Sequence, residues 1–235
     1  MKVLQILPQL NIGGVERGTL DLSKALIHKG HQSFVISGGG VLVDELTQCG
    51  AKHYEIPVHI KSLRTLSLAK RLSETISSID PDIVHVRSRM PAWVNYRAFK
   101  MLQKKPLLVS TFHGLYSFPI YSKVMSFVDH SIAISKTVER YILENYKLDK
   151  GDITVIPRGC DPLEFNNEVI NPVDKANIIE EFPQIVGKKV LTIPGRITKW
   201  KGVAEFIDLL SLLDDNYHGL IVGPTAKSKK KYLNK

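Results

Sequence analysis

A strand pattern gives way to a helix pattern in residues 194–202 (PGRITKWKG), which carry the cationic side chains of Arg196, Lys199 and Lys201. Arg196 and Lys201 bracket this turn. A helix dipole disfavours cations at a helix N-terminus, so their position indicates an anionic ligand. The two cations, the dipole and the free N–H groups would together select a diphosphate. The simpler alternative is a solvated basic turn.

A second turn of this type follows the first predicted strand. Gly13 and Gly14, with Glu16 two residues further on, lead into a helix pattern. Glycines let backbone N–H groups approach a ligand closely, and the helix N-terminus behind them favours an anion. A tight turn without a ligand is equally compatible with the pattern. The dinucleotide fingerprint GxGxxG is absent from this turn.

Other polar residues differ in where they stand relative to the predicted strands. His113 (in STFHG) comes just past a strand end, where ligands bind in open α/β sheets, so we expect a functional role. His85 lies inside a strand and is expected to be a hydrogen-bonded core residue. Asp80 and Asp82 form a DxD pattern, but they precede a strand and stand at the opposite edge, so we do not expect a metal site there.

Some features favour plain structural interpretations. The run of glycines at residues 38–40 is most simply a flexible loop. Cys49 and Cys160 have no CxxC or CxxH neighbours, which disfavours zinc, and we expect two free thiols. Patterns of metalloproteases, serine hydrolases and Walker A nucleotide sites are absent.

The elements that must position these residues alternate between apolar runs and amphipathic segments, the pattern of a doubly wound parallel α/β sheet. Both sheet faces must then be covered by helices. Strands are predicted at residues 2–7, 33–37, 53–56, 82–86, 107–111, 131–135, 153–156, 189–193 and 219–222. Helices are predicted at residues 20–28, 63–79, 93–102, 136–146 and 202–213.

The rhythm breaks once, at residues 166–187, which carry Pro172, Pro183 and one weak helical stretch. We predict a first Rossmann-like domain at residues 1–165, a linker at 166–187, an incomplete second domain at 188–226 and a basic tail at 227–235. A doubly wound domain of about 100–150 residues is not completed by the residues that follow the last predicted strand.

Composition and charge exclude several classes of protein. The chain has 235 residues, of which 43% are hydrophobic and 23% charged, which argues against general disorder. Five lysines of the tail account for more than half of the net charge of +9, leaving +4 on residues 1–226. Since this excess lacks interleaved aromatics, nucleic-acid binding is not expected. No signal peptide or membrane-spanning run is found, so a cytoplasmic location is expected.

Six motifs in order resemble the retaining nucleotide-sugar glycosyltransferases of family 4, which have the GT-B fold. They are GGVER, PDIVHV, STFHG, SIAIS before a helix, VIPRGCDPLEF and PGRITKWKG. The resemblance implies two Rossmann-like domains that face a cleft. The first would bind the acceptor, and the second most of the nucleotide sugar.

The resemblance also implies roles for particular residues. Gly13, Gly14 and Gly195 would lie beside the donor diphosphate, which Arg196 and Lys201 would hold while stabilising the leaving group without a metal or other cofactor. His113 would lie near the transferred sugar, and Glu16 is a further candidate. Arg158 replaces the family's usual asparagine; it either adds a phosphate contact or is a variant turn.

The sequence departs from the family at its end. The glutamate motif E-x7-E of the donor domain is not reached, so we expect a chain truncated in that domain. The expected function is transfer of a sugar to a lipid-linked or polysaccharide acceptor of the lipopolysaccharide type, in cell-envelope synthesis at the inner membrane face. The alternative is a non-catalytic remnant, or half of a split enzyme completed by a separate chain, that binds acceptor without turnover.

Overall fold

The computed structural model describes residues 1–60, 67–116, 119–163, 166 and 171–224. The predicted basic tail lies outside these residues. The chain divides into two compact units, Met1–Gly159 and Cys160–Lys235, and each is described by itself. The division follows Gly159, whereas the sequence analysis ended the first domain at residue 165.

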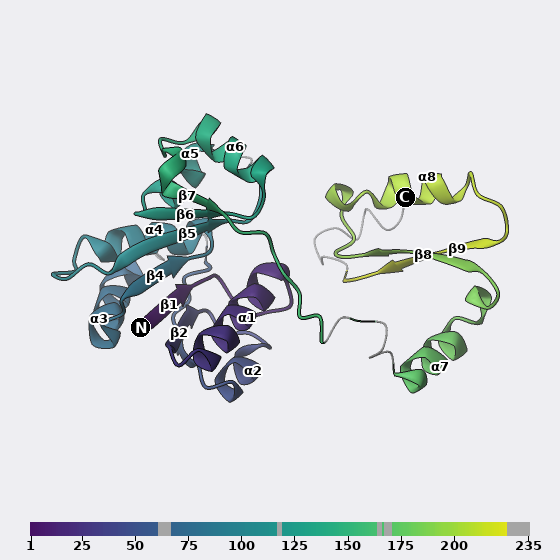
Figure 1. Ribbon diagram of the computed structural model, residues 1–235, viewed down its shortest axis with the longest axis horizontal. Coiled ribbons are helices and arrows are strands. Elements are labelled where there is room, and N and C mark those ends of the chain that lie inside the picture. The colour runs from purple at the N-terminus through teal and green to yellow at the C-terminus, as the bar shows by residue number, and fades with distance from the viewer. Residues whose placement is uncertain (61–66, 117–118, 164–165, 167–170, 225–235) are drawn as a thin grey trace. The chain divides into compact units, whose positions relative to one another are not determined.

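The first unit is built on a seven-stranded sheet in which every neighbouring pair is parallel (Figure 1). The strand order is β3-β2-β1-β4-β5-β6-β7. The order reverses at β1, because the chain runs outward to β3 and then returns to pair β4 with the other side of β1. The strands are β1 (Lys2–Ile6), β2 (Gln32–Ser37), β3 (Lys52–Glu55), β4 (Ile83–Val86), β5 (Leu107–Phe112), β6 (His130–Ala133) and β7 (Ile153–Val155).

Helices connect the strands of this unit. Among the described residues they are α1 (Gly14–His28), α2 (Val43–Gln48), α3 (Ala69–Ile79), α4 (Arg89–Phe99), α5 (Pro119–Ser122) and α6 (Lys136–Asn145), with short 3₁₀ segments at Lys123–Ser126 and Lys150–Asp152. None of the described helices in either unit is both long and apolar enough to cross a bilayer.

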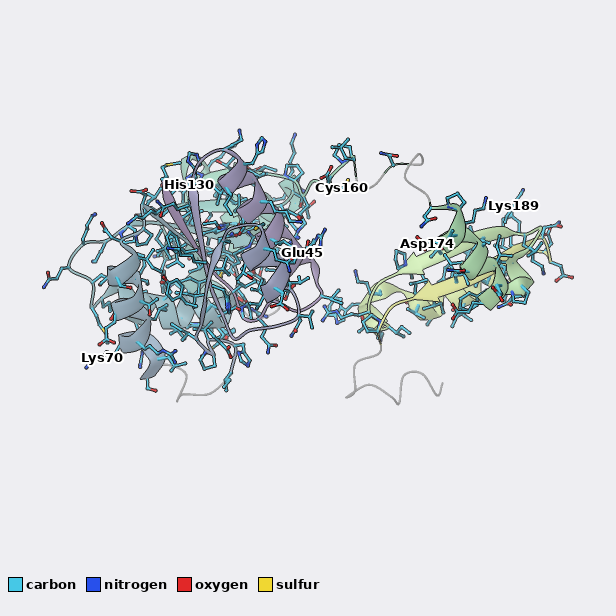
Figure 2. The ribbon with its side chains drawn as sticks, turned by 90° about the horizontal axis from the view of Figure 1, so that it is seen from below. Glu45, Lys70, His130, Cys160, Asp174 and Lys189 are labelled. Carbon is cyan, nitrogen blue, oxygen red and sulfur yellow. The ribbon has the colours of Figure 1, made fainter. Side chains whose placement is uncertain are left out.

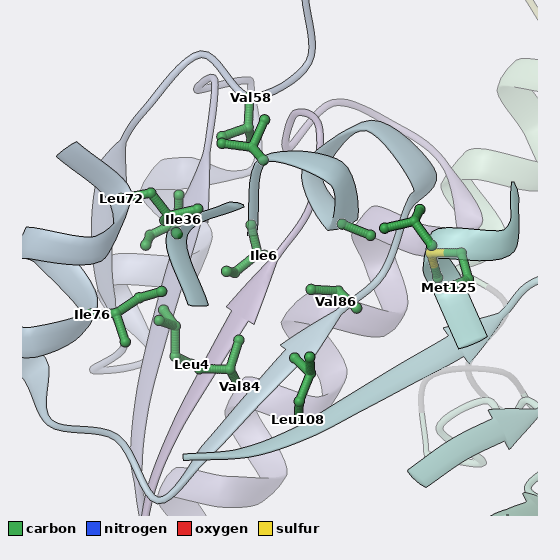
Figure 3. Close-up of a cluster of buried hydrophobic side chains, with 14 of the residues drawn as sticks. Leu4, Ile6, Ile36, Val58, Leu72, Ile76, Val84, Val86, Leu108 and Met125 are labelled. Carbon is green, nitrogen blue, oxygen red and sulfur yellow. The ribbon is translucent and has the colours of Figure 1, made fainter. Parts of the chain in front are cut away.

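Two separate apolar clusters cover the two sheet faces. Successive side chains of a strand point to opposite faces, so Ile36 of β2 joins the larger cluster while its neighbour Val35 joins the smaller one. The larger cluster packs α3, α4 and α6 on the sheet, where Leu72 of α3 lies beside Ile36 of β2 and Ile76 of α3 beside Leu4 of β1 (Figure 3). The smaller cluster packs α1 and α2, through Leu20 among others. Burial on both faces explains the continuous apolar strands.

The glycine run at residues 38–40 is not a free loop, contrary to our expectation. Leu10 donates its backbone N–H to the Gly39 carbonyl at 2.8 Å, and its own carbonyl accepts from the Leu42 N–H at 2.8 Å. Gly40 has φ 140, and a β-carbon there would stand 2.4 Å from the Leu10 carbonyl carbon. The glycine therefore lets the loop after β2 lock the loop after β1, which carries Gly13.

The second unit contains a parallel pair of strands, β8 (Lys189–Pro194) and β9 (Tyr217–Val222), joined through α8 (Val203–Leu210). The chain enters this unit at Cys160, and Asp174 and Lys189 lie within it (Figure 2). Gly223 approaches the carbonyl of Gly195 so closely that a β-carbon would overlap it. This contact holds the turn after β8 against the end of β9.

The predicted fold class is confirmed: each predicted strand is present, with ends that differ by one to a few residues. The predicted helices are also found where the structure describes them. The short helix α2 was not predicted, and the predicted linker contains the helix α7 (Pro172–Glu181), which Asn171 caps by accepting the Val173 N–H. Both cysteines are free thiols.

We predict that Gly40→Ala destabilises the protein by about 3 kcal/mol or more, because the methyl group adds overlap with the Leu10 backbone to the strain of a positive φ. Urea unfolding of the full chain measures this. Gly114→Ala is the matched control, since its φ of 155 is similar but nothing lies within 4 Å; we expect a loss of about 1 kcal/mol. Equal losses would contradict the loop-locking role.

Candidate functional site

The carboxyl ends of β1 and β4 form the switch point of the sheet, where strand order reverses and ligands of open α/β folds bind. Gly13 and Gly14 follow β1, and Arg87 comes directly after β4. Arg87 extends the pairing of the two strands, since its N–H donates to the Ile6 carbonyl at 3.0 Å. His113 follows β5, so these residues share one edge of the sheet.

The turn after β1 leaves the first N–H groups of α1 without a side-chain cap. Gly13 is the N-cap residue in an extended conformation and has no side chain to accept their hydrogen bonds. Glu16 is the acidic residue of the first turn, and a β-carbon on Gly13 would collide with its carboxylate. The predicted pair Gly13 and Gly14 therefore opens an uncapped helix N-terminus at the switch point.

Arg87 is the cation buried at this edge, with 6% of its surface exposed. Its Nη1 donates to Oε1 of Gln5 at 2.7 Å, and Gln5 in turn donates to the Thr19 carbonyl and the Ser23 hydroxyl of α1. Burial, with a smaller contribution from Arg158, lowers the pKa of Arg87 to about 10. Arg87 therefore remains charged at neutral pH.

Arg158 comes after β7 and reaches back to α1. Its Nη1 donates to the Gly14 carbonyl, and its Nη2 lies 2.8 Å from Nδ1 of His113. The structure thus brings together three residues that the sequence analysis named separately: Gly14, His113 and Arg158. The side chain of Arg158 thus joins the ends of β5 and β7 to the start of α1.

The hydrogen bond from Arg158 fixes the tautomer of His113. A guanidinium only donates, so Nδ1 must be the acceptor, and the proton of the neutral ring is then on Nε2. Nε2 is buried and has no partner among the described residues. Burial, followed by the charges of Arg87 and Arg158, lowers the pKa of His113 to about 3. His113 is therefore a neutral donor with a free N–H.

The second unit holds the other predicted cations. Gly195, with φ 137, follows β8, and the side chain of Lys201 packs over it, with Cε 3.4 Å from where a β-carbon would stand. Gly202 is the N-cap of α8, and no side chain caps this helix. Arg196 and Lys201 are exposed, and in the described part of the chain neither forms an ion pair. Lys201 thus stands before an uncapped helix N-terminus, as predicted.

His85, Asp80 and Asp82 each have a polar partner within the first unit. His85 is buried, with Nε2 2.7 Å from the Thr111 hydroxyl. Asp80 pairs with Lys104 at 2.8 Å, and Asp82 accepts the N–H of Lys2, both at the amino end of β4. The described residues include no cluster of three or more His, Cys, Asp or Glu side chains able to hold a metal.

Sequence reasoning missed two residues of the site, Gln5 and Arg87. Gln5 is a polar residue within a buried strand, and Arg87 follows the strand in VHVRS. The signal that could have found Arg87 is its position one residue past a predicted strand, the criterion applied to His113.

Comparison with known proteins now adds to this geometry. Residues 12–163 match the family model described as Glycosyltransferase Family 4. An uncharacterized glycosyltransferase of Methanocaldococcus jannaschii is 30% identical over 65% of this chain and 43% of its own length. One subunit of human phosphatidylinositol N-acetylglucosaminyltransferase is 25% identical over 72% of this chain and 38% of its own. The chain thus spans less than half the length of these curated relatives.

Solved structures with a similar fold also include glycosyltransferases. A glycosyltransferase from Rickettsia africae has a TM-score of 0.79 and 33% identity, over 99% of this chain and 62% of its own. Anabaena HepE, crystallised with UDP and glucose, has a TM-score of 0.81 at 17% identity, covering 100% of this chain and 64% of its own; at that identity the likeness shows the fold alone. The fold is that of GT-B glycosyltransferases. By the family match and these likenesses, the chain belongs to glycosyltransferase family 4.

Proposed function

We propose that this protein transfers a sugar from a nucleoside-diphosphate sugar to an acceptor, with retention of the anomeric configuration. The observation that carries the proposal is the pair Arg196 and Lys201 before the uncapped N-terminus of α8, in a chain of family 4. Cations, helix dipole and free N–H groups there favour a diphosphate. HepE structures with UDP and with UDP-glucose are in keeping with such a donor.

In this proposal the protein supplies the positive charge that stabilises the leaving group. Negative charge grows on the diphosphate as the glycosidic bond breaks, and Arg196 and Lys201 would stabilise it without a metal. Gly13, Gly14 and Gly195 would allow close approach of the phosphates, and Glu16 would stand nearby. Catalysis would rest on positioning and leaving-group stabilisation, since no protein nucleophile is assigned.

His113 would act as a hydrogen-bond donor to the transferred sugar. Its buried Nε2–H has no partner among the described residues, and its low pKa excludes the imidazolium at neutral pH. A neutral ring that already carries its proton on Nε2 does not accept a proton at that atom. The geometry therefore favours sugar positioning over general base catalysis for His113.

The acceptor in this proposal is lipid-linked or a polysaccharide, at the cytoplasmic face of a membrane. Two kinds of relative support such an acceptor. The human relative is a subunit of a phosphatidylinositol N-acetylglucosaminyltransferase. Structures of similar fold include WaaB, a lipopolysaccharide outer core galactosyltransferase, and WaaG, a glycosyltransferase of lipopolysaccharide biosynthesis. A UDP-N-acetylglucosamine 2-epimerase from Rickettsia bellii has a TM-score of 0.61, so an assay must separate transfer from epimerisation. Labelled acceptor product distinguishes the two.

We predict that Arg196→Ala and Lys201→Ala each weaken binding of UDP or GDP by about tenfold or more, because each removes a charge-assisted contact to the diphosphate. Titration calorimetry on the full chain measures this. Lys175→Ala, which removes an equal charge from exposed α7 of the same unit, is the control and should bind as the wild type does. Equal affinities in all four proteins would refute the role of the pair.

We predict that His113→Gln retains most of the transfer rate, because its amide N–H can replace Nε2–H, whereas His113→Ala loses about a hundredfold in kcat/KM. The pH profile gives a second test. The pKa of His113 in the folded protein is about 3, so the ring stays neutral between pH 8 and pH 5. Titration of His113 should therefore not change the rate over this range. A limb near pH 6.5 that His113→Gln abolishes would contradict the neutral donor.

A further inference from the structure

Two guanidinium groups converge beside the first turns of α1. A β-carbon on Gly18 would stand 3.2 Å from Nη2 of Arg87 and 3.3 Å from Nη1 of Arg158. The same Arg158 nitrogen lies 3.3 Å from the corresponding position on Gly14. The lack of side chains at Gly14 and Gly18 therefore leaves room for both arginines along one face of the helix.

Neither arginine has a counter-ion in the described part of the chain. Among the described residues, the guanidinium of Arg87 forms one hydrogen bond, to the neutral amide of Gln5, and its buried Nε has no partner. Arg158 bonds to a carbonyl and to a neutral imidazole. A buried cation without a paired anion is costly, and two cations side by side add repulsion.

The nearby carboxylates offset this excess only in part, because burial lowers the pKa of Arg87 more than Asp21 and Glu16 raise it. Asp21 lies 3.5 Å from Nε of Arg17, and Glu45 pairs with Arg17 and Lys24. Arg17 thus shows how this fold satisfies a structural arginine, with carboxylates on α1 and α2. Arg87 and Arg158 lack such partners, although they stand at the edge where the uncapped α1 begins.

We propose that Arg87 and Arg158, which converge beside Gly18 of α1, form a second anion subsite for a phosphate group of the acceptor. The proposal rests on the proposed function. The diphosphate of a nucleotide sugar carries two negative charges, which Arg196 and Lys201 already match. Two further cations match a second dianion, and a phosphate ester presents several oxygens to guanidinium donors.

The neighbouring His113 gives this subsite a place in the reaction. Arg158 holds Nδ1 of His113, so a phosphate that engages Arg158 lies next to the donor that would position the sugar. The acceptor hydroxyl would be oriented by its own phosphate. Acceptors without the phosphate would then lose positioning while the donor still binds.

The test is titration of the full chain with inorganic phosphate, with and without saturating UDP. We expect saturable phosphate binding that Arg158→Asn, which restores the family's usual residue, weakens about tenfold. Arg87→Gln should weaken phosphate binding to the same extent. If that variant fails to fold, Arg87→Lys takes its place: it keeps the charge but loses the planar guanidinium, so it should also bind phosphate more weakly than wild type. Arg97→Gln, an exposed arginine in the last turn of α4, is the control of equal charge change.

Three outcomes would overturn the proposal: UDP displaces the phosphate, Lys201→Ala abolishes phosphate binding, or the Arg87 and Arg158 variants bind phosphate like wild type. The first two would assign the arginines to the donor. Failure of the proposed function gives a different result. UDP would then not bind, or its affinity would not change in Arg196→Ala and Lys201→Ala. In either case phosphate would still bind at Arg87 and Arg158.

Discussion

The buried hydrogen bond between Gln5 and Arg87 is the interaction on which the ligand edge of the first unit depends. It places a polar strand residue, the end of the neighbouring strand and the inner face of α1 in one network, because the Gln5 amide is fully used on both sides. A buried amide with all its partners fixes geometry, whereas a partly satisfied one is destabilising. α1 therefore cannot shift on the sheet without stranding either Gln5 or Arg87.

Backbone contacts fix the rest of this edge. The loop after β2 holds the loop after β1 through Leu10, so the uncapped start of α1 has a defined position. Arg158 then joins the end of the sheet's last strand to that start. In the second unit, the turn after β8 is likewise held by neighbouring residues, since Gly223 and Lys201 pack on Gly195. Both units thus present cations near an uncapped helix N-terminus that follows a parallel strand.

Much of this architecture could be predicted from the sequence, because strands buried on both faces must be continuously apolar and the helices between them amphipathic. The turn glycines, His113 and the cations of residues 194–202 were found because each follows a predicted strand. The sequence could not show that Arg158 reaches Gly14, since the contact spans 144 positions of chain. Nor could it give the tautomer of His113, which depends on that contact. α2 escaped detection because six residues hold too little of a helical period.

Arg158 stands immediately before Gly159, the last residue of the first unit. The last residues of the first unit are therefore held at the ligand edge, because the Arg158 side chain forms hydrogen bonds with both Gly14 and His113. The guanidinium has five N–H donors, of which one goes to Gly14 and one to His113, so further donors remain for an anion. An anion bound to those donors would therefore contact the same side chain that ties the end of the first unit to α1 and to His113.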